Sequence, residues 1–337
     1  RKESSAASDV YKRQSYTIDV YRKDIKPLTN ILDYAFYVSF FPQLVAGPIV
    51  RARDFIPQIR KPLFVSQEMF GRGIFLILSG LFKKAIISDY ISVNFVERIF
   101  DNPTLYSGLE NLMGVYGYAL QIYCDFSGYS DMAIGIALLL GFHFNLNFNS
   151  PYKSASITEF WRRWHISLTT WFRDYIYIPL GGSRAGKWKS FRNTLVIFLV
   201  SGFWHGANWT FVAWGAYHAL LFLPLLLLGQ NRRYRDSVAE NSFLPSVKEL
   251  TQMGATFLLV LLGWILFRSE DISQAAVYLE RMFNVSLFSA PQLVGLGFGQ
   301  LLLKKCFFFT ALMFVVEWIG RKQAHGLMIC LLYTSDA

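Results

Sequence analysis

The sequence is poor in charged residues and in cysteine. Asp, Glu, Lys and Arg make up 17% of its 337 residues, whereas 53% are hydrophobic and 17% aromatic. Because about a quarter of a typical soluble domain is charged, this composition argues against an ordinary soluble enzyme. The three cysteines, Cys124, Cys306 and Cys330, are scattered along the chain. Their number and spacing predict neither a disulfide framework nor a zinc site, and we expect no bound metal.

Positive charge exceeds negative charge, with a formal net charge of +10. The basic residues gather beside apolar segments, as in Arg232-Arg233 and Lys304-Lys305. Such clusters are typical of cytoplasmic loops and helix ends in membrane proteins. They do not resemble the basic patch of a nucleic-acid-binding domain. We therefore expect a lipid bilayer, and no nucleic acid, as a partner.

Several apolar stretches approach the length of about 20 residues that crosses a bilayer. The longest are residues 112–144, 208–228, 252–267 and 301–318. This pattern predicts an all-α, multi-pass transmembrane protein with one membrane domain over residues 15–320. Residues 1–14 are polar and patternless, so we expect a non-native or disordered end, and residues 321–337 form a doubtful tail. Without a start methionine or signal peptide, the chain is expected to begin inside a longer protein.

Two acidic residues interrupt the apolar stretch 112–144. Asp125 and Asp131 lie six residues apart, and a carboxylate in a membrane segment cannot face lipid without a large free-energy cost. We expect both to face protein or a water-filled cavity, where they can line a substrate passage. The alternative is that they only form hydrogen bonds with neighbouring helices.

Residues 156–175 have the pattern of an amphipathic helix. Ser156 and Glu159 form a capping-box motif at its start. Spacings of three and four then align Trp161, Trp164, His165, Leu168, Trp171, Phe172 and Tyr175. We expect this helix to lie at the membrane interface with its aromatic face toward protein or acyl chains. Taken alone, His165 on that face is more typical of a packing residue.

A second histidine follows a short apolar segment. Residues 194–204 predict about eleven residues of helix, which at 1.5 Å per residue span roughly 16 Å, about half a bilayer core. His205 comes next, beside Gly206, and residues 208–228 supply a full span. The backbone at such a break is tolerated only where protein or a water-filled cavity satisfies it. We expect His205 to lie inside the membrane.

The two histidines suit acyl transfer. A neutral imidazole in a dry passage can accept the proton of an alcohol as that alcohol attacks an activated acyl group, and excluding water protects the acyl donor from hydrolysis. His205 is the predicted base. His165 would hydrogen-bond the substrate or polarise a thioester carbonyl. The passage itself is predicted to be lined by Trp164, Trp204, Asn208, Trp209, Asp125 and Asp131.

Several segments resemble one known family. They are residues 15–21, 40–49, 123–132, 160–168, 175–182 and 203–207, which include the sequences FWRRWHISL, YIYIPLGG and FWHGA. Together they are similar to the membrane-bound O-acyltransferase family, and most of all to its bacterial alginate O-acetyltransferases. The resemblance runs from about Ser15 to Trp318. The resemblance implies N-terminal membrane helices before the position of Ser15, and we expect this chain to lack them.

The resemblance implies a fold and an activity. The fold is a ring of tilted helices around a central funnel, with re-entrant and interfacial helices, and the position of His205 is essential while that of His165 is also functional. The activity is acetyl transfer to a hydroxyl of an exported polysaccharide, in the bacterial cytoplasmic membrane. The donor is a cytoplasmic thioester, either acetyl-CoA or an acylated carrier, used as co-substrate without a permanently bound cofactor. Partner acetyltransferase proteins act at the periplasmic or extracellular face.

Other functions remain open at this point. Within the family they are D-alanyl transfer to teichoic acid and O-acetylation of peptidoglycan. From a different class, a transporter for a glycan or lipid-linked sugar also uses aromatic passages and buried aspartates. Transporters often contain internal repeats, and the sequence shows none. Because no serine or cysteine adjoins His205 in sequence, we expect direct transfer rather than an acyl-enzyme.

Overall fold

A computed structural model of the chain describes residues 2–44, 46–184, 186–230, 238–240, 242–292 and 299–323. In these ranges every regular element is a helix, as the sequence predicts, and there is no β-strand. Two of the described helices, Trp209–Leu227 and Val247–Arg268, are long and apolar enough to cross a membrane. Both coincide with predicted spans.

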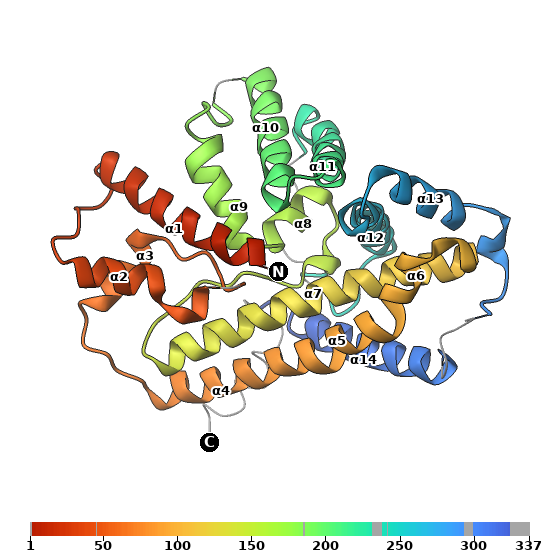
Figure 1. The fold of residues 1–337 in the computed structure, drawn as a ribbon, viewed down its shortest axis with the longest axis horizontal. Coiled ribbons are helices and arrows are strands. Elements are labelled where there is room, and N and C mark those ends of the chain that lie inside the picture. Colours follow the sequence, from red (N-terminus) through yellow and green to blue (C-terminus); the bar gives the residue numbers. More distant parts are fainter. Residues whose placement is uncertain are drawn as a thin grey trace.

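Figure 1 labels the α-helices in chain order. The α-helices are α1 (Lys2–Tyr21), α2 (Ile31–Ser39), α3 (Ala52–Ile59), α4 (Gln67–Leu81), α5 (Asp89–Ile91), α6 (Glu97–Asp101), α7 (Gly108–Leu139), α8 (Ile157–Arg163), α9 (Ile166–Phe172), α10 (Lys187–His205), α11 (Trp209–Leu227), α12 (Val247–Arg268), α13 (Ile272–Met282) and α14 (Gly299–Ile319). Three π-helical segments join or extend them, at Phe82–Ser88, Ser92–Val96 and Arg173–Tyr177.

The long helix α7 crosses the middle of the molecule, and α4 lies along it (Figure 1). Glycines at seven-residue intervals bring the two backbones together: Gly73 meets Gly135, and Gly80 meets Gly128. A Cβ atom added to Gly80 would lie 2.4 Å from the carbonyl oxygen of Gly128, and one added to Gly135 would lie 2.5 Å from that of Gly73. Any side chain at these positions would therefore push the helices apart.

Helices α10 and α11 form a second close pair (Figure 1). A Cβ atom added to Gly202 or Gly215 would lie 2.3 Å from the carbonyl oxygen of Phe211 or Phe198, respectively. Helix α10 has 19 residues and begins at Lys187, so the prediction of about eleven residues was too short. Its first turns are rich in Lys and Arg, which favour helix but carry no hydropathy signal.

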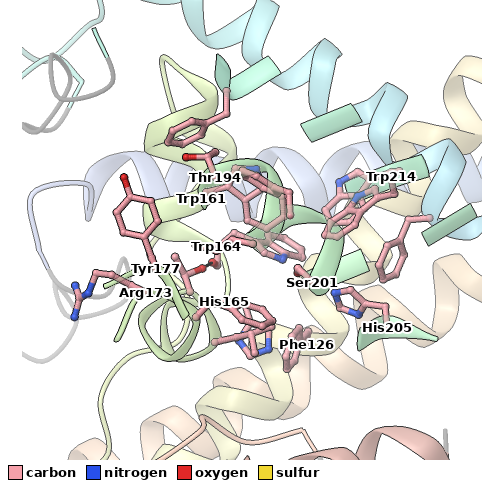
Figure 2. A pocket seen from close by; sticks show the side chains of 18 of the residues that line it. Phe126, Trp161, Trp164, His165, Arg173, Tyr177, Thr194, Ser201, His205 and Trp214 are labelled. Atoms are coloured by element: carbon pink, nitrogen blue, oxygen red, sulfur yellow. Dashed lines mark hydrogen bonds between the residues drawn. The ribbon is translucent and has the colours of Figure 1, made fainter. Parts of the chain in front are cut away.

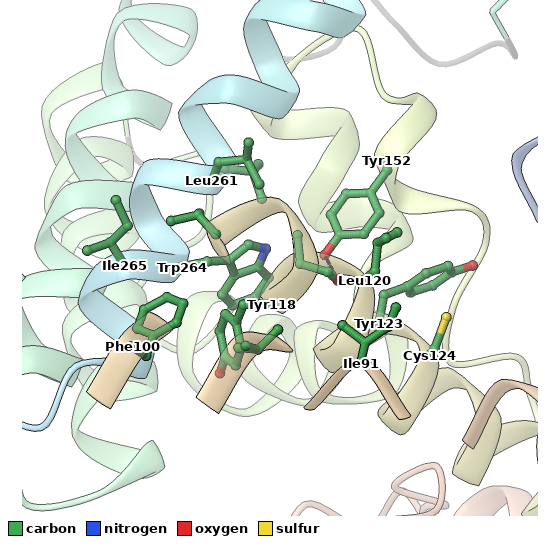
Figure 3. Close-up of a cluster of buried hydrophobic side chains, with 14 of the residues drawn as sticks. Ile91, Phe100, Tyr118, Leu120, Tyr123, Cys124, Tyr152, Leu261, Trp264 and Ile265 are labelled. Carbon is green, nitrogen blue, oxygen red and sulfur yellow. Dashed lines mark hydrogen bonds between the residues drawn. The ribbon is translucent and has the colours of Figure 1, made fainter. Parts of the chain in front are cut away.

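An aromatic core joins α7, α8 and α12. Trp264 lies among buried side chains that include Tyr118, Tyr152 and Leu261 (Figure 3). The Tyr152 hydroxyl donates to the carbonyl oxygen of Ala119 at 2.7 Å. This core fixes α8, and with it the histidine that follows, against the long helix α7.

The N-terminal region is helical in the structure, in one helix Lys2–Tyr21, and whether residues 1–14 are a non-native end stays a prediction. Among residues 10–21, whose burial the structure describes, Lys12, Ser15 and Asp19 are buried, and they lie three and four residues apart. Because this buried face is polar, hydrophobic periodicity could not reveal the helix. At the other end, residues 324–337 of the predicted tail lie outside the described residues.

Candidate active site

The predicted amphipathic helix at 156–175 is interrupted in its middle. Helix α8 ends at Arg163, His165 takes the left-handed conformation with φ 45° and ψ 56°, and α9 begins at Ile166. The predicted N-cap is confirmed, since the Ser156 hydroxyl accepts from the Glu159 N–H at 3.2 Å. The Glu159 carboxylate, however, accepts from the N–H of Ala155. A positive φ is rare outside glycine, so His165 is held in place by its surroundings.

Asn147 provides much of that support. Its Oδ1 accepts from the Ser167 backbone N–H at 3.2 Å and from the Ser167 hydroxyl at 2.8 Å, and it lies 3.0 Å from Nδ1 of His165. An atom that accepts from a backbone N–H must be the amide oxygen, so Nδ1 of His165 is the donor. The neutral ring then keeps a free lone pair on Nε2.

His205 ends α10 at the predicted helix break. The chain turns at Gly206, and Asn208 caps α11 by accepting from the Thr210 N–H at 3.0 Å. Aromatic rings surround the His205 imidazole, with centroid distances of 4.6 Å to Trp204, 5.3 Å to Trp214 and 4.9 Å to Phe267. The ring therefore sits in an apolar setting at the end of a helix.

Both histidines line one cavity of about 350 Å³ (Figure 2). Most of its wall is aromatic or aliphatic. Its polar side chains, apart from the histidines, are Thr169, Arg173, Tyr177, Ser183, Thr194 and Ser201. Figure 2 shows Arg173 and Tyr177 at the opposite end from His205. An apolar cavity of this size with a few convergent polar groups is typical of a small-molecule site.

The other predicted passage residues lie in different places. Trp164 lines the cavity, and Trp204 contacts the rings of both histidines. Asn208, besides capping α11, donates to the carbonyl oxygen of Glu270 at 2.6 Å, and Trp209 is 76% exposed. Neither Asn208 nor Trp209 is among the side chains that line this cavity.

The two aspartates lie away from the histidines. Asp131 is buried and pairs with Lys83 at 2.8 Å, whereas Asp125 pairs with Lys84 at 2.6 Å and keeps a side chain that is 46% exposed. Asp131 faces protein and a second cavity, so it avoids lipid, and its pairing with Lys83 also fits the alternative in which it only contacts a neighbouring helix. Asp125 has the more exposed side chain of the two, and neither aspartate lines the cavity of the histidines.

The sequence analysis did not predict two residues of the site, one that lines the cavity and one that supports His165. Ser201 precedes His205 by one helical turn and lines the same cavity; the four-residue spacing was a usable signal. Asn147 lies in an irregular segment before α8, where no periodicity exists to predict its contact with His165. Among the described residues, no cluster of His, Cys, Asp and Glu could hold a metal ion.

Comparison with known proteins gives these helices a family. The model of the membrane-bound O-acyltransferase family matches residues 20–242, which include both histidines. The chain belongs to this family. Membership also identifies a membrane protein, in agreement with the two apolar helices α11 and α12.

The chain is similar to proteins that carry three different names. The chain is 41% identical over 296 residues to the probable alginate O-acetylase AlgI of Pseudomonas aeruginosa, covering 86% of this chain and 54% of that protein. It is 40% identical to the peptidoglycan O-acetyltransferase of Helicobacter pylori (77% and 48% covered). It is 30% identical to the teichoic acid D-alanyltransferase of Bacillus subtilis (74% and 63% covered). The chain thus spans about half the length of the alginate O-acetylases it matches.

Proposed function

We propose that the protein containing this chain is an O-acetyltransferase of the bacterial cytoplasmic membrane. It moves an acetyl group from a cytoplasmic thioester, acetyl-CoA or an acylated carrier, to a hydroxyl of an exported, alginate-like polysaccharide. The observation that carries the proposal is that His165 and His205, from separate elements, line one largely apolar cavity. The similarity to alginate O-acetylases supports the choice of acyl group and acceptor.

In this mechanism His205 is the general base. Its imidazole takes the proton of the acceptor hydroxyl while the hydroxyl oxygen bonds to the thioester carbonyl carbon. The carbon–sulfur bond then breaks, and the departing thiolate recovers the proton from the imidazolium. Aromatic walls exclude water, which protects the thioester from hydrolysis.

The tautomer of His165 favours one of its two predicted roles. Because Nδ1 donates to Asn147, Nε2 of the neutral ring can accept a hydrogen bond but cannot donate one to a carbonyl oxygen. We infer that His165 orients a hydroxyl of the acceptor rather than polarising the thioester. A hydroxyl such as that of Ser201, which lines the same cavity, is better suited to donate to the carbonyl.

The two ends of the cavity suggest how the substrates approach. Arg173 and Tyr177 lie at the end far from His205 (Figure 2), and the Arg173 side chain is 58% exposed. A cationic, hydrogen-bonding entrance suits an anionic thioester donor arriving from the cytoplasm. The acceptor would come from the opposite side, where we propose that partner acetyltransferase proteins continue the transfer.

Replacing His205 in the full-length protein tests this mechanism. His205→Ala is expected to abolish both thioester consumption and polysaccharide acetylation while membrane insertion is unchanged. His143→Ala is the matched control, because His143 is exposed and lies outside the cavity. Undiminished acetylation in His205→Ala would overturn the mechanism. An acyl group trapped on Ser201 would show that transfer is not direct.

Two of the relatives support a different acceptor or a different acyl group. The peptidoglycan O-acetyltransferase and the teichoic acid D-alanyltransferase match much of the chain, and the same two histidines suit their chemistry. Mass spectrometry of the cell envelope, comparing wild type with His205→Ala, identifies the group that disappears. If His205→Ala loses D-alanyl esters and keeps its acetyl esters, the transferred group in this proposal is D-alanyl and not acetyl.

A further inference from the structure

A second cavity borders a different face of α7 from the cavity of the histidines. Its volume is about 400 Å³. Ile122 and Phe126 of α7 line the histidine cavity, whereas Tyr123, Ser127 and Asp131 line the second one, and the two cavities share no lining residue. The ring of Phe148 stands between them, 5.1 Å from that of Trp164. The second cavity is therefore a separate site.

The floor of this cavity is charged. Lys83 pairs with Asp131 at 2.8 Å, and the Tyr123 hydroxyl donates to the Glu317 carboxylate. All four residues are buried, and Figure 3 shows the Tyr123 hydroxyl pointing away from the aromatic core. Two carboxylates and one ammonium face this cavity, and the buried Lys153 adds a positive charge close to Glu317. Buried charges of this kind mark functional sites in membrane proteins.

Ser127 adds an unused hydrogen-bonding group. It is 1% exposed, its hydroxyl has no hydrogen-bond partner among the described residues, and it lines the cavity. A buried hydroxyl without a partner is costly unless a ligand or water satisfies it. It can donate one hydrogen bond to an oxygen atom and accept others.

The backbone aims Lys83 at this floor. Lys83 and Lys84 lie in the π-helical segment Phe82–Ser88, a rare geometry that often marks functional sites. Lys83 turns inward to Asp131, while Lys84 turns outward to Asp125 and Asp89. The two adjacent lysines thus point to different faces of this segment.

The walls of the cavity are apolar and reach the surface of the molecule. Leu78, Phe82 and Leu312 line it and are 60%, 39% and 44% exposed. Exposed apolar side chains of this kind are suited to contact with acyl chains. The cavity therefore combines an apolar mouth with a floor that carries both signs of charge.

We propose that this cavity binds a membrane lipid with a zwitterionic head group that carries an ammonium. The acyl chains lie along the apolar mouth, the ammonium faces the carboxylates of Asp131 and Glu317, and the phosphate oxygens accept from Lys83 and Ser127. An anionic lipid that lacks the ammonium would offer these two carboxylates no positive charge to pair with. The lipid is a structural or regulatory ligand, distinct from the acyl donor and acceptor.

Native mass spectrometry of the full-length protein tests the proposal. The detergent-solubilised protein is mixed with equal amounts of phosphatidylethanolamine and phosphatidylglycerol that carry the same acyl chains. One molecule of phosphatidylethanolamine is expected to stay bound in preference to phosphatidylglycerol. Glu317→Gln removes one acceptor charge and is expected to lower that preference about tenfold, and Leu312→Trp, which narrows the mouth, is expected to reduce retention of both lipids.

Two controls make the outcome decisive. Asp125→Asn removes a carboxylate from the outward face of α7, the helix that also carries Ser127 and Asp131, and is expected to leave the preference unchanged. Ser127→Ala, which introduces no new polar group, is expected to weaken retention even if Glu317→Gln does not fold. The proposal is overturned if no preference exists, or if folded Glu317→Gln and Ser127→Ala keep it. It is also overturned if a photo-crosslinker at Leu312 reacts with another segment of the same chain instead of lipid.

Discussion

Asn147 determines which nitrogen of His165 can meet a substrate. Its amide oxygen contacts Nδ1 of His165 at 3.0 Å, and its amide nitrogen donates to the Ser130 hydroxyl at 3.1 Å. Both contacts are buried, so neither is weakened by competition with water. Asn147 is therefore a positioning residue that acts through His165.

Replacing Asn147 is expected to slow turnover more than it weakens binding. Without the amide oxygen, the ring of His165 can adopt the other tautomer, and the acceptor hydroxyl loses its partner. For Asn147→Ala we expect kcat to fall about tenfold or more with a smaller change in KM. Steady-state acetyl transfer by the full-length protein measures both constants.

The controls for this prediction lie in the same hydrogen-bond network. Ser167→Ala removes a donor that shares the Asn147 oxygen but does not touch the histidine, so it should reduce stability more than kcat. Asn147→Asp keeps an acceptor for Nδ1 and is expected to recover activity relative to Asn147→Ala. Equal loss of kcat in Ser167→Ala and Asn147→Ala would mean that Asn147 acts only through stability.

Asp174 ties three separate elements together through arginines. Its carboxylate pairs with Arg51 and Arg53 near α3 and with Arg173, and its backbone oxygen accepts from Arg22. Burial by itself raises the pKa of Asp174, but the hydrogen bonds and charges of Arg173 and Arg51 outweigh it, so the pKa is lowered from its ordinary value of 3.8. Asp174 lies outside the two candidate membrane-spanning helices.

This lowered pKa gives a stability that depends on pH. A carboxylate whose folded pKa lies below its unfolded value stabilises the fold above the unfolded pKa, and the effect is lost as pH falls through the folded pKa. Asp174→Asn is expected to destabilise the protein by about 1 kcal/mol at pH 7, with a difference that shrinks below about pH 4. Thermal unfolding at pH 7 and pH 3 measures it, and Asp33→Asn, whose pairing with Arg60 at 3.8 Å is looser, is the control. A difference independent of pH would contradict this account.

The sequence reveals these residues unequally. His205 could be predicted because a glycine, a helix break and an apolar flank mark it within a few residues. His165 could be predicted from its motif, but its left-handed backbone could not, because the aromatic periodicity continues through the break. Asn147 and Asp174 depend on contacts across 18 and more than 100 residues, which no local pattern encodes.

At the scale of elements, the pairing of α4 with α7 rests on glycine. The two helices cross where Gly80 faces Gly128 and Gly73 faces Gly135. Close backbone approach through small residues is a common way for membrane helices to associate. The same approach carries Lys83 to Asp131, so the glycine contacts also position the floor of the second cavity.

Adding one methyl group at this crossing is expected to be costly. In Gly80→Ala the new Cβ would lie 2.4 Å from the Gly128 carbonyl oxygen, so the helices must separate, and we expect destabilisation of about 1–3 kcal/mol. Gly71→Ala is the matched control on the same helix, because no atom lies within 4 Å of its added Cβ. That substitution is expected to be neutral or to stabilise by about 0.5–1 kcal/mol. Equal melting temperatures for the two variants would contradict the close crossing.

Helix existence was easier to predict than helix extent. The predicted spans at 208–228 and 252–267 match α11 and α12, because a continuous apolar run has few alternatives to a helix in a membrane. The extent of α1 was not predicted because its buried residues are polar, and that of α10 because its first residues are polar. The π-helical segments were also missed, because their side-chain pattern differs from that of an α-helix by one residue per turn.

At the scale of the whole molecule, α7 is a wall between two sites. Ile122 and Phe126 line the histidine cavity, whereas Tyr123, Ser127 and Asp131 line the second one, which explains why apolar and polar residues alternate in this part of the helix. From the sequence alone this mixture predicted that Asp125 and Asp131 avoid lipid and line a substrate passage, but neither lines the cavity of the histidines. The ring of helices around a funnel, which the family resemblance implies, remains a prediction for the full-length protein.

The proposed route of the donor predicts a fixed orientation in the membrane. Ser183 lines the histidine cavity, is exposed, and is followed by the basic residues Arg184, Lys187 and Lys189. Because such loops remain on the cytoplasmic side, Ser183→Cys in the full-length protein should react with a membrane-impermeant maleimide in inside-out vesicles but not in intact cells. Bound acyl donor should slow that reaction, since the donor occupies the same end of the cavity. The unsubstituted protein gives the background from its own cysteines. Labelling of Ser183→Cys from outside the cell would reverse the orientation and, with it, the side from which the thioester reaches His205.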